Sequence, residues 1–179
     1  VYISEGGMNM AGLGDDVINR QERLFTMVEQ YQTTILKVCY AYLCNLEDAK
    51  DAVQETFLKA YNNLGSFRGE CSEKSWLIRI ARNTCLDMRR SAWYRRVDQR
   101  IQLEDLSEVH QSDAPEDEQQ LTYAIMRLPS KLKDAVILYY YQDLPMKEVA
   151  EILNITQPSV SNRLSRARKK LKMHLEEER

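Results

Sequence analysis

Side chains that can bind nucleic acid recur near the C-terminus, where a helix is expected over residues 157–175. Ser159, Asn162, Arg163, Arg166 and Lys170 fall on one face of this helix, and apolar residues fall on another. Arginine can hydrogen-bond guanine at two points and asparagine can do so with adenine, whereas serine and lysine contact base edges or phosphates. The pattern indicates a helix that reads DNA. The alternative is a basic, solvent-exposed helix of a purely structural hairpin.

The segment before this helix has the features of a helix-turn-helix. A short helix carrying Val149, Ala150 and Leu153 ends at Asn154, and a turn over residues 155–157 follows. Pro158 then stands near the first helical position, where its fixed φ suits the helix and no needed donor is lost. Two short helices joined by about three to four residues form the arrangement that places the second helix in the major groove.

Charge is segregated along the chain, although the formal net charge is only −2. Residues 79–100 contain seven arginines against two acids, residues 101–122 contain seven acids and no Lys or Arg, and residues 163–172 contain six bases and no acid. Basic blocks attract a polyanion because each neutralised phosphate releases counterions. Two basic blocks separated by an acidic spacer indicate nucleic acid as a partner.

Helical periodicity also dominates the N-terminal half. Apolar residues at three- and four-residue steps, among them Ile35 and Val38, predict a helix over residues 24–42. Similar patterns predict helices over 49–64 and 76–90, with Asn45 and Ser72 as candidate N-caps. No alternating run bounded by turn residues indicates a β-sheet. The sequence therefore predicts an all-α protein.

The periodic segments group into two small helical domains joined by an acidic linker. The linker has no period and contains Pro115. The expected boundaries are a disordered leader over residues 1–19, a first domain over 20–98, the linker over 99–120 and a helix-turn-helix domain over 121–179.

Little in the sequence supports catalysis or a bound metal. The phosphate-cradling loop, the dinucleotide fingerprint, the nucleophile elbow and the zinc-protease motif are all absent. Four cysteines without a C-x-x-C pair and only two histidines give no zinc spacing, and reduced, buried thiols are expected instead. We expect no enzyme, no cofactor and no metal. Because the chain lacks an apolar stretch of about 20 residues and an export leader, we expect a cytoplasmic location.

Several segments, in order along the chain, resemble bacterial RNA polymerase sigma factors of the extracytoplasmic-function (ECF) group. Residues 48–61 (DAKDAVQETFLKAY) are similar to one characteristic stretch of that group, and residues 67–70 (FRGE) with 76–83 (WLIRIARN) to a second. Leu128-Pro129 and residues 148–153 and 159–168 resemble its second domain. The resemblance covers about residues 21–97 and 121–175.

The resemblance implies protein partners for the first domain. In that family this domain docks on the clamp helices of the RNA polymerase β′ subunit. The matching candidates are Asp51, Gln54, Glu55, Leu58 and Tyr61, whereas Val53 and Phe57 are expected in the core. The resemblance also implies an anti-sigma factor that covers this face and can hold the protein at the membrane.

The resemblance further implies that the loop at 67–75 and the helix at 76–90 melt the promoter and capture a flipped −10 base. An unstacked base needs a pocket, and its strand needs cations. The candidates are Phe67, Arg68, Ser75, Arg79, Arg82, Asn83, Asp87, Arg89 and Arg90, with Trp76 expected in the core.

By the same resemblance, the C-terminal helix reads the −35 element. The candidates are Ser159, Ser161, Asn162, Arg163, Arg166 and Lys170. Ser161-Asn162 stands where the family more often has Lys or Arg followed by Ser or Thr, so the base sequence read is not carried over. Pro145 stands where Ser or Thr commonly caps the first helix of the motif.

Two other functions fit parts of the same pattern. A stand-alone helix-turn-helix transcriptional regulator would use residues 20–100 for dimerisation or sensing, and would bind a palindromic duplex without polymerase. A helical adaptor would bind protein only, and Arg163 and Arg166 would then be dispensable.

Overall fold

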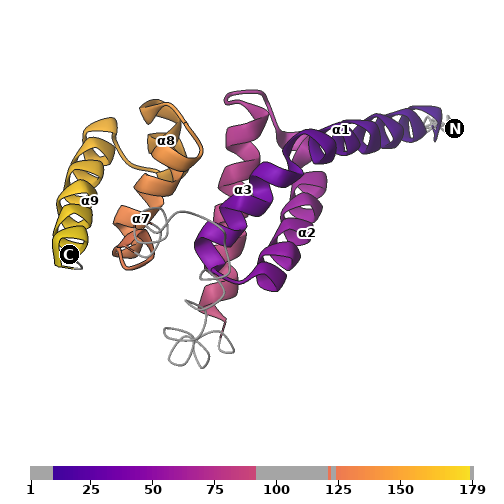
Figure 1. The fold of residues 1–179 in the computed structure, drawn as a ribbon. Helices are drawn as coiled ribbons and strands as arrows, with labels where there is room; N and C mark the ends of the chain where they lie inside the picture. Colours follow the sequence, from indigo (N-terminus) through magenta and orange to yellow (C-terminus); the bar gives the residue numbers. More distant parts are fainter. Residues whose placement is uncertain (1–9, 92–120, 122–123, 178–179) are drawn as a thin grey trace, which may run out of the picture.

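The computed structural model describes residues 10–91, 121 and 124–177, and all regular structure in this part of the chain is helical. In the N-terminal part, α1 (Met10–Leu43), α2 (Leu46–Asn63) and α3 (Glu73–Arg90) pack against one another, with the 3₁₀ turn η1 (Leu64–Ser66) after α2. In the C-terminal part, α7 (Ser130–Val136), the π-helical turn η2 (Ile137–Tyr141), α8 (Met146–Leu153) and α9 (Gln157–Glu177) form a second unit. The predicted all-α fold is confirmed (Figure 1).

The three N-terminal helices meet along apolar stripes at helical spacing. Ile35 and Val38 of α1, Ala52 of α2, and Leu77 and Ala81 of α3 are fully buried. Burial of such side chains stabilises the fold by about 25 cal/mol per Å² of apolar area removed from water. Phe57 and Trp76 also lie in this core, as expected from their positions. The stripes leave the opposite face of α2 exposed, whereas part of the opposite face of α3 contacts the C-terminal unit.

Two side-chain caps fix where α2 and α3 begin. The Asn45 side-chain oxygen accepts a hydrogen bond from the Asp48 amide at 3.0 Å, and the Ser72 hydroxyl accepts one from the Ser75 amide at 3.1 Å. Each cap satisfies a backbone donor that has no partner within the helix. Both candidate N-caps are confirmed.

The substitution Asn45→Ala is expected to lower the free energy of unfolding by about 1 kcal/mol, because it removes the acceptor for the Asp48 amide. Urea unfolding followed by circular dichroism measures this. Asn62→Ala, at an exposed position near the other end of α2, is the matched control and should change stability by less than about 0.5 kcal/mol. Equal losses in the two variants would contradict the cap.

The first helix begins earlier than the sequence pattern predicts. Residues 10–19 are helical in α1, where an irregular leader was expected. Once the packed part of α1 has formed, each further residue adds a hydrogen bond without a new nucleation cost, so the helix extends through Gly12 and Gly14. The expected linker, and the basic block beyond residue 91, lie outside the described residues.

The helix that begins at Ser130 changes its winding. The chain is α-helical through Val136, and the Gln142 amide then donates to the Ile137 carbonyl at 3.0 Å, which closes a π-helical turn. Asp143 follows with φ 52°, a left-handed conformation that Asp tolerates better than most residues. The wider turn leaves Tyr140 and Tyr141 exposed. None of the helices in the described part of the chain combines the length and apolar character needed to cross a bilayer.

Candidate nucleic-acid interface

The basic face of α9 lies on the outside of the C-terminal unit. Val160, Leu164 and Ala167 are buried against α7 and α8, which fixes the rotation of the helix. The side chains predicted to read DNA therefore point outward. Ser159, Ser161, Asn162, Arg166 and Lys170 are exposed and Arg163 is half-buried.

The charges on this face are available to a ligand. Within the described part of the chain, Arg163, Arg166 and Lys170 make no ion pair. Among the basic residues of α9, Lys172 pairs with Glu176 at 3.6 Å. The Ser159 hydroxyl lies 2.9 Å from that of Thr156, whose oxygen accepts a hydrogen bond from the Ser159 amide at 3.4 Å near the start of the helix. Asn154, with φ 52°, makes the left-handed turn that separates α8 from α9.

The first helix of the motif starts without a side-chain cap. Pro145 occupies the N-cap position of α8 and makes no side-chain hydrogen bond there, as its sequence position predicted. The Val149 amide instead begins the helical ladder on the Pro145 carbonyl at 3.1 Å. The turn geometry, rather than a cap, sets the direction of α8.

A second basic surface runs along α3. Arg79, Asn83 and Arg90 are exposed, Arg89 is half-buried, and Asp87 is exposed and lies 3.8 Å from Arg90. Ser75 and Arg82, the two remaining candidates on this helix, are not exposed. Ser75 is only 2% exposed, and the Arg82 side chain retains 17% of its exposure because it contacts the C-terminal unit.

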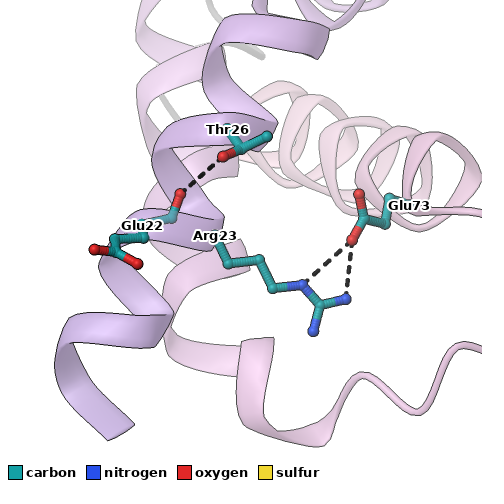
Figure 2. Close-up of polar contacts among 4 residues, drawn as sticks. All are labelled: Glu22, Arg23, Thr26 and Glu73. Atoms are coloured by element: carbon teal, nitrogen blue, oxygen red, sulfur yellow. Dashed lines mark hydrogen bonds and ion pairs between the residues drawn. The ribbon is translucent and has the colours of Figure 1, made fainter. Parts of the chain in front are cut away.

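The loop before α3 is held in a defined shape. The Phe67 and Trp76 rings lie 4.8 Å apart, and the Arg23 guanidinium lies 5.5 Å from the centre of the Phe67 ring. The same guanidinium donates two hydrogen bonds to one oxygen of Glu73, at 2.9 and 3.3 Å (Figure 2). Gly69 adopts φ 73°, a left-handed backbone conformation that residues with a side chain rarely adopt. Arg23 of α1 thus ties the loop to the start of α3.

A cavity of about 600 Å³ opens beside this loop. Phe67, Arg68, Trp76 and Arg79 are among the residues that line it from the N-terminal part, and Glu151 and Asn154 line it from the C-terminal part. An aromatic wall beside two guanidinium groups can stack an unpaired base and neutralise its phosphates. Of the residues predicted to handle a flipped base, three line this cavity: Phe67, Arg68 and Arg79.

A buried charged group joins α1, α3 and α7. The Arg82 Nη2 lies 2.6 Å from the Asp134 Oδ2, and the Tyr42 hydroxyl is buried nearby. Burial first, and the Asp134 carboxylate second, raise the pKa of Tyr42 well above its ordinary value. Burial lowers the pKa of Arg82, but the hydrogen bond to Asp134 and the charge of that carboxylate outweigh it, and the net pKa is raised. Arg82 therefore stays charged.

The substitution Tyr42→Phe is expected to change stability mainly at alkaline pH. Tyrosine in the unfolded chain ionises near pH 10, whereas the raised pKa of Tyr42 keeps it neutral to higher pH in the folded protein. Its contribution to the free energy of unfolding is therefore complete below about pH 10 and is lost as the pH rises toward the pKa in the folded protein. Urea unfolding of both proteins at pH 8 and pH 11 measures this. The wild type should lose more free energy of unfolding than Tyr42→Phe between the two pH values. Equal losses would contradict the assignment, since all other tyrosines are common to both proteins.

The residues predicted to bind polymerase lie on one side of α2. Asp51, Gln54, Glu55 and Leu58 are exposed, and Tyr61 is half-buried. Leu58 retains 60% of its exposure, which is high for a leucine next to a packed core. Glu55 lies 3.4 Å from Lys59, and this pair flanks the exposed leucine. An exposed apolar side chain rimmed by charges is typical of a protein-binding surface.

Sequence reasoning missed Arg23, Asp134 and Glu148. Asp134 and its neighbour Lys133 interrupt an otherwise apolar run from Leu132 to Leu138, and such an interruption is a signal of a buried charge. Arg23 and Glu148 carry no comparable signal, because each looks like an ordinary surface charge on a helix.

The sequence matches two family models. Sigma-70 region 2 matches residues 27–106, and Sigma-70, region 4 matches residues 118–171. The chain is also 32% identical over 174 residues to the RNA polymerase sigma factor YlaC of Bacillus subtilis (strain 168), covering 90% of this chain and 97% of that protein. This chain belongs to the ECF family of RNA polymerase sigma factors.

Other comparisons agree with the family and the fold. The ECF RNA polymerase sigma factor SigW of Bacillus subtilis (strain 168) is 32% identical over 170 residues, covering 87% of this sigma factor and 90% of SigW. Among solved structures, CnrH in complex with the cytosolic domain of CnrY matches with a TM-score of 0.68 at 20% identity, over 93% of this chain and 96% of that one. RpoE of Bartonella quintana, in complex with the anti-sigma factor NepR, matches with a TM-score of 0.64 at 22% identity, over 88% and 99%. The stand-alone regulator is not favoured.

Within the described residues of this sigma factor, no group of three or more His, Cys, Asp and Glu side chains is placed to hold a metal ion. The four cysteines are free thiols, and Cys39 and Cys85 are fully buried. A hydrogen bond with Cys39, followed by burial, raises the pKa of the Cys85 thiol. Because the thiolate is the reactive form, the raised pKa and the burial of Cys85 both disfavour reaction of its thiol in the folded protein.

Proposed function

We propose that this sigma factor binds core RNA polymerase through α2 and reads two promoter elements with separate helices. Its first domain, residues 20–98, would hold the polymerase and the opened −10 strand. Its second domain, residues 121–179, would read the −35 duplex with α9, and residues 99–120 would link the two. The polymerase carries out the chemistry, and the sigma factor itself has no catalytic role.

The observation that carries this proposal is the outward basic face of α9. Asn162, Arg166 and Lys170 are exposed while the opposite face of the same helix anchors it on α7 and α8. A helix that presents arginine and asparagine side chains at its surface fits the major groove, where these residues distinguish base pairs. Ser159 and Ser161 would support this reading, with Arg163 at the edge of the face.

The assignment of the −10 strand to α3 rests on the cavity and its cations. Phe67 supplies aromatic surface, backed by the core residue Trp76, and Arg68 and Arg79 supply charge at the rim. Asn83 and Arg90 extend the basic surface along α3. Arg82 and Ser75 belong to the same helix and are covered by the C-terminal unit.

Polymerase binding is assigned to α2, in line with the β′ clamp helices as partner. Leu58 gives an apolar centre, and Asp51, Gln54, Glu55 and Tyr61 surround it with groups that can hydrogen-bond. An anti-sigma factor is a further proposed partner, because the solved structures of similar fold include sigma factors in complex with such proteins. Work at RNA polymerase would place this protein in the cytoplasm.

Run-off transcription tests this function. Core RNA polymerase is incubated with fragmented genomic DNA, with and without the purified sigma factor. New discrete transcripts are expected only with the sigma factor, and they should disappear with Gln54→Ala combined with Leu58→Ala. Absence of new transcripts, together with specific duplex binding by the protein alone, would overturn the proposal in favour of a stand-alone regulator.

A further inference from the structure

One face of α1 contacts the segment between α2 and α3. Arg20 and Arg23 lie three positions apart, so both side chains project from the same face of the helix. The Arg20 guanidinium lies against the backbone of Gly65, since a Cβ atom at Gly65 would be only 3.1 Å from its Nη2. The Arg23 guanidinium donates to Glu73 (Figure 2) and lies over the Phe67 ring. The two arginines therefore contact this segment near its start, at its middle and where α3 begins.

The residues held by these contacts belong to the surface proposed for the −10 strand. Phe67 and Arg68 line the cavity beside the loop. The Phe67 ring packs against Trp76 as well as against the Arg23 guanidinium, so both neighbours set its orientation. Neither arginine of α1 lines the cavity in the part of the chain that the structure describes. Arg23 would therefore affect a bound base through Phe67 and not by touching the base.

The core alone does not fix the shape of the loop. Arg68, Gly69 and Glu70 at its tip are exposed. Segments with few buried apolar contacts open locally at a low cost in free energy. The pair of Arg23 and Glu73 is itself partly exposed, with 44% and 34% of the two side chains accessible. Such a pair contributes little to global stability, so its removal should loosen the loop without unfolding the domain.

We propose that Arg23, with Arg20 beside it, is a positioning residue that holds the loop in the shape required to discriminate among bases of the −10 strand. This inference rests on the proposed function of the loop and of α3. A site that adopts its binding-competent shape only part of the time binds its ligand more weakly in proportion. The preferred base gains most from contacts with the ordered loop. Loosening the loop should therefore reduce the use of that base more than the use of the others.

Limited proteolysis of the full chain tests the positioning without DNA. Trypsin cleaves after Arg68 faster when the loop opens, and mass spectrometry identifies the new chain ends. Arg23→Gln should speed this cleavage about threefold or more. Lys37→Gln removes one positive charge from an exposed position of the same helix and should leave the rate unchanged. Equal rates of cleavage in the wild type and in Arg23→Gln would overturn the positioning role.

Glu73→Gln removes the same ion pair from the α3 side and gives a second route if Arg23→Gln fails to fold. It should also speed cleavage after Arg68. Because the two residues act as one pair, combining Arg23→Gln with Glu73→Gln should add little to the effect of Arg23→Gln alone. Full additivity of the two effects would overturn the proposal, since the pair would then not be what holds the loop.

Base discrimination by polymerase with this sigma factor tests what the positioning does. Run-off transcription is measured from a promoter that the wild type uses, and from a copy carrying the −10 base substitution that the wild type tolerates least. Arg23→Gln should lower the ratio of the two outputs about fivefold, whereas Lys37→Gln should keep it within about twofold of the wild-type ratio. A general loss of folded protein would reduce both outputs and leave the ratio unchanged.

Two negative results of this assay have different meanings. An unchanged ratio in a folded Arg23→Gln protein would overturn the proposal. If the wild type yields no transcript at all, the proposed function fails, and proteolysis still decides whether Arg23 positions the loop.

Discussion

The substitution Leu58→Glu is expected to weaken binding of the sigma factor to core RNA polymerase by roughly 30-fold or more. Leu58 keeps 60% of its exposure at the centre of the α2 surface, so an interface there would bury it. Central, fully buried anchors contribute about 2 kcal/mol or more when truncated, and a buried unpaired carboxylate adds a further penalty. Fluorescence anisotropy with labelled sigma factor and core polymerase measures the affinity.

Leu46→Glu is the matched control for this prediction. Leu46 is 45% exposed on the same helix but lies outside the proposed polymerase surface. In urea unfolding, the free energy of unfolding of both variants should lie within about 0.5 kcal/mol of the wild-type value, as for most substitutions at the surface. Wild-type affinity in Leu58→Glu, or an equal loss in Leu46→Glu, would count against this use of α2.

The substitution Arg166→Ala is expected to reduce transcription from promoters of this sigma factor by about tenfold or more, with no loss of polymerase binding. Arg166 is exposed and makes no ion pair within the described part of the chain, so its charge is free for DNA. A specific arginine contact to a base contributes about 1–3 kcal/mol. Run-off transcription at several salt concentrations measures the effect, since loss of a phosphate contact would also lower the salt dependence.

Lys172→Ala provides the comparison on the same helix. Lys172 lies beyond the proposed reading face and pairs with Glu176 at 3.6 Å. Its removal should change promoter output by less than about threefold. If Lys172→Ala and Arg166→Ala reduce transcription equally, transcription depends on the overall positive charge of α9 and not on one face that contacts the bases.

The periodicity of apolar residues and the capping residues were enough to predict most of the fold. The stripe of apolar residues through Ile35 and Val38 predicted which face of α1 would be buried. Asn45 and Ser72 predicted where α2 and α3 begin, and Asn154 predicted the turn of the helix-turn-helix. These features could be predicted because they depend on neighbours within a few positions in the sequence.

Contacts between the two domains could not be predicted in the same way. The spacing of Arg82 along α3 placed it near the exposed side of the helix, and only the packing of α7 shows that Asp134 faces it. Glu148 has the position of an ordinary acid in the first turn of α8, yet it accepts hydrogen bonds from α3. A sequence pattern reports which face of a helix is polar but not which partner lies across it.

The start of α1 and the π-helical turn η2 illustrate a second limit. Glycines at 12 and 14 predicted irregular structure, but a helix already stabilised by packing extends through them. The apolar run of residues 135–138 fits both an α-helix and a π-helical turn, because the two differ by one residue per turn. Such local choices depend on what the neighbouring helices can accommodate.

Sequencing the 5′ ends of the transcripts made by core polymerase with this sigma factor tests the central claim most directly. Two helices that read DNA on one polymerase predict two short motifs upstream of every start site, separated by one nearly fixed spacing. Arg166→Ala should relax the upstream motif, and Arg79→Ala should weaken use of the downstream one. A single palindromic motif, or start sites with no shared motif, would contradict the account.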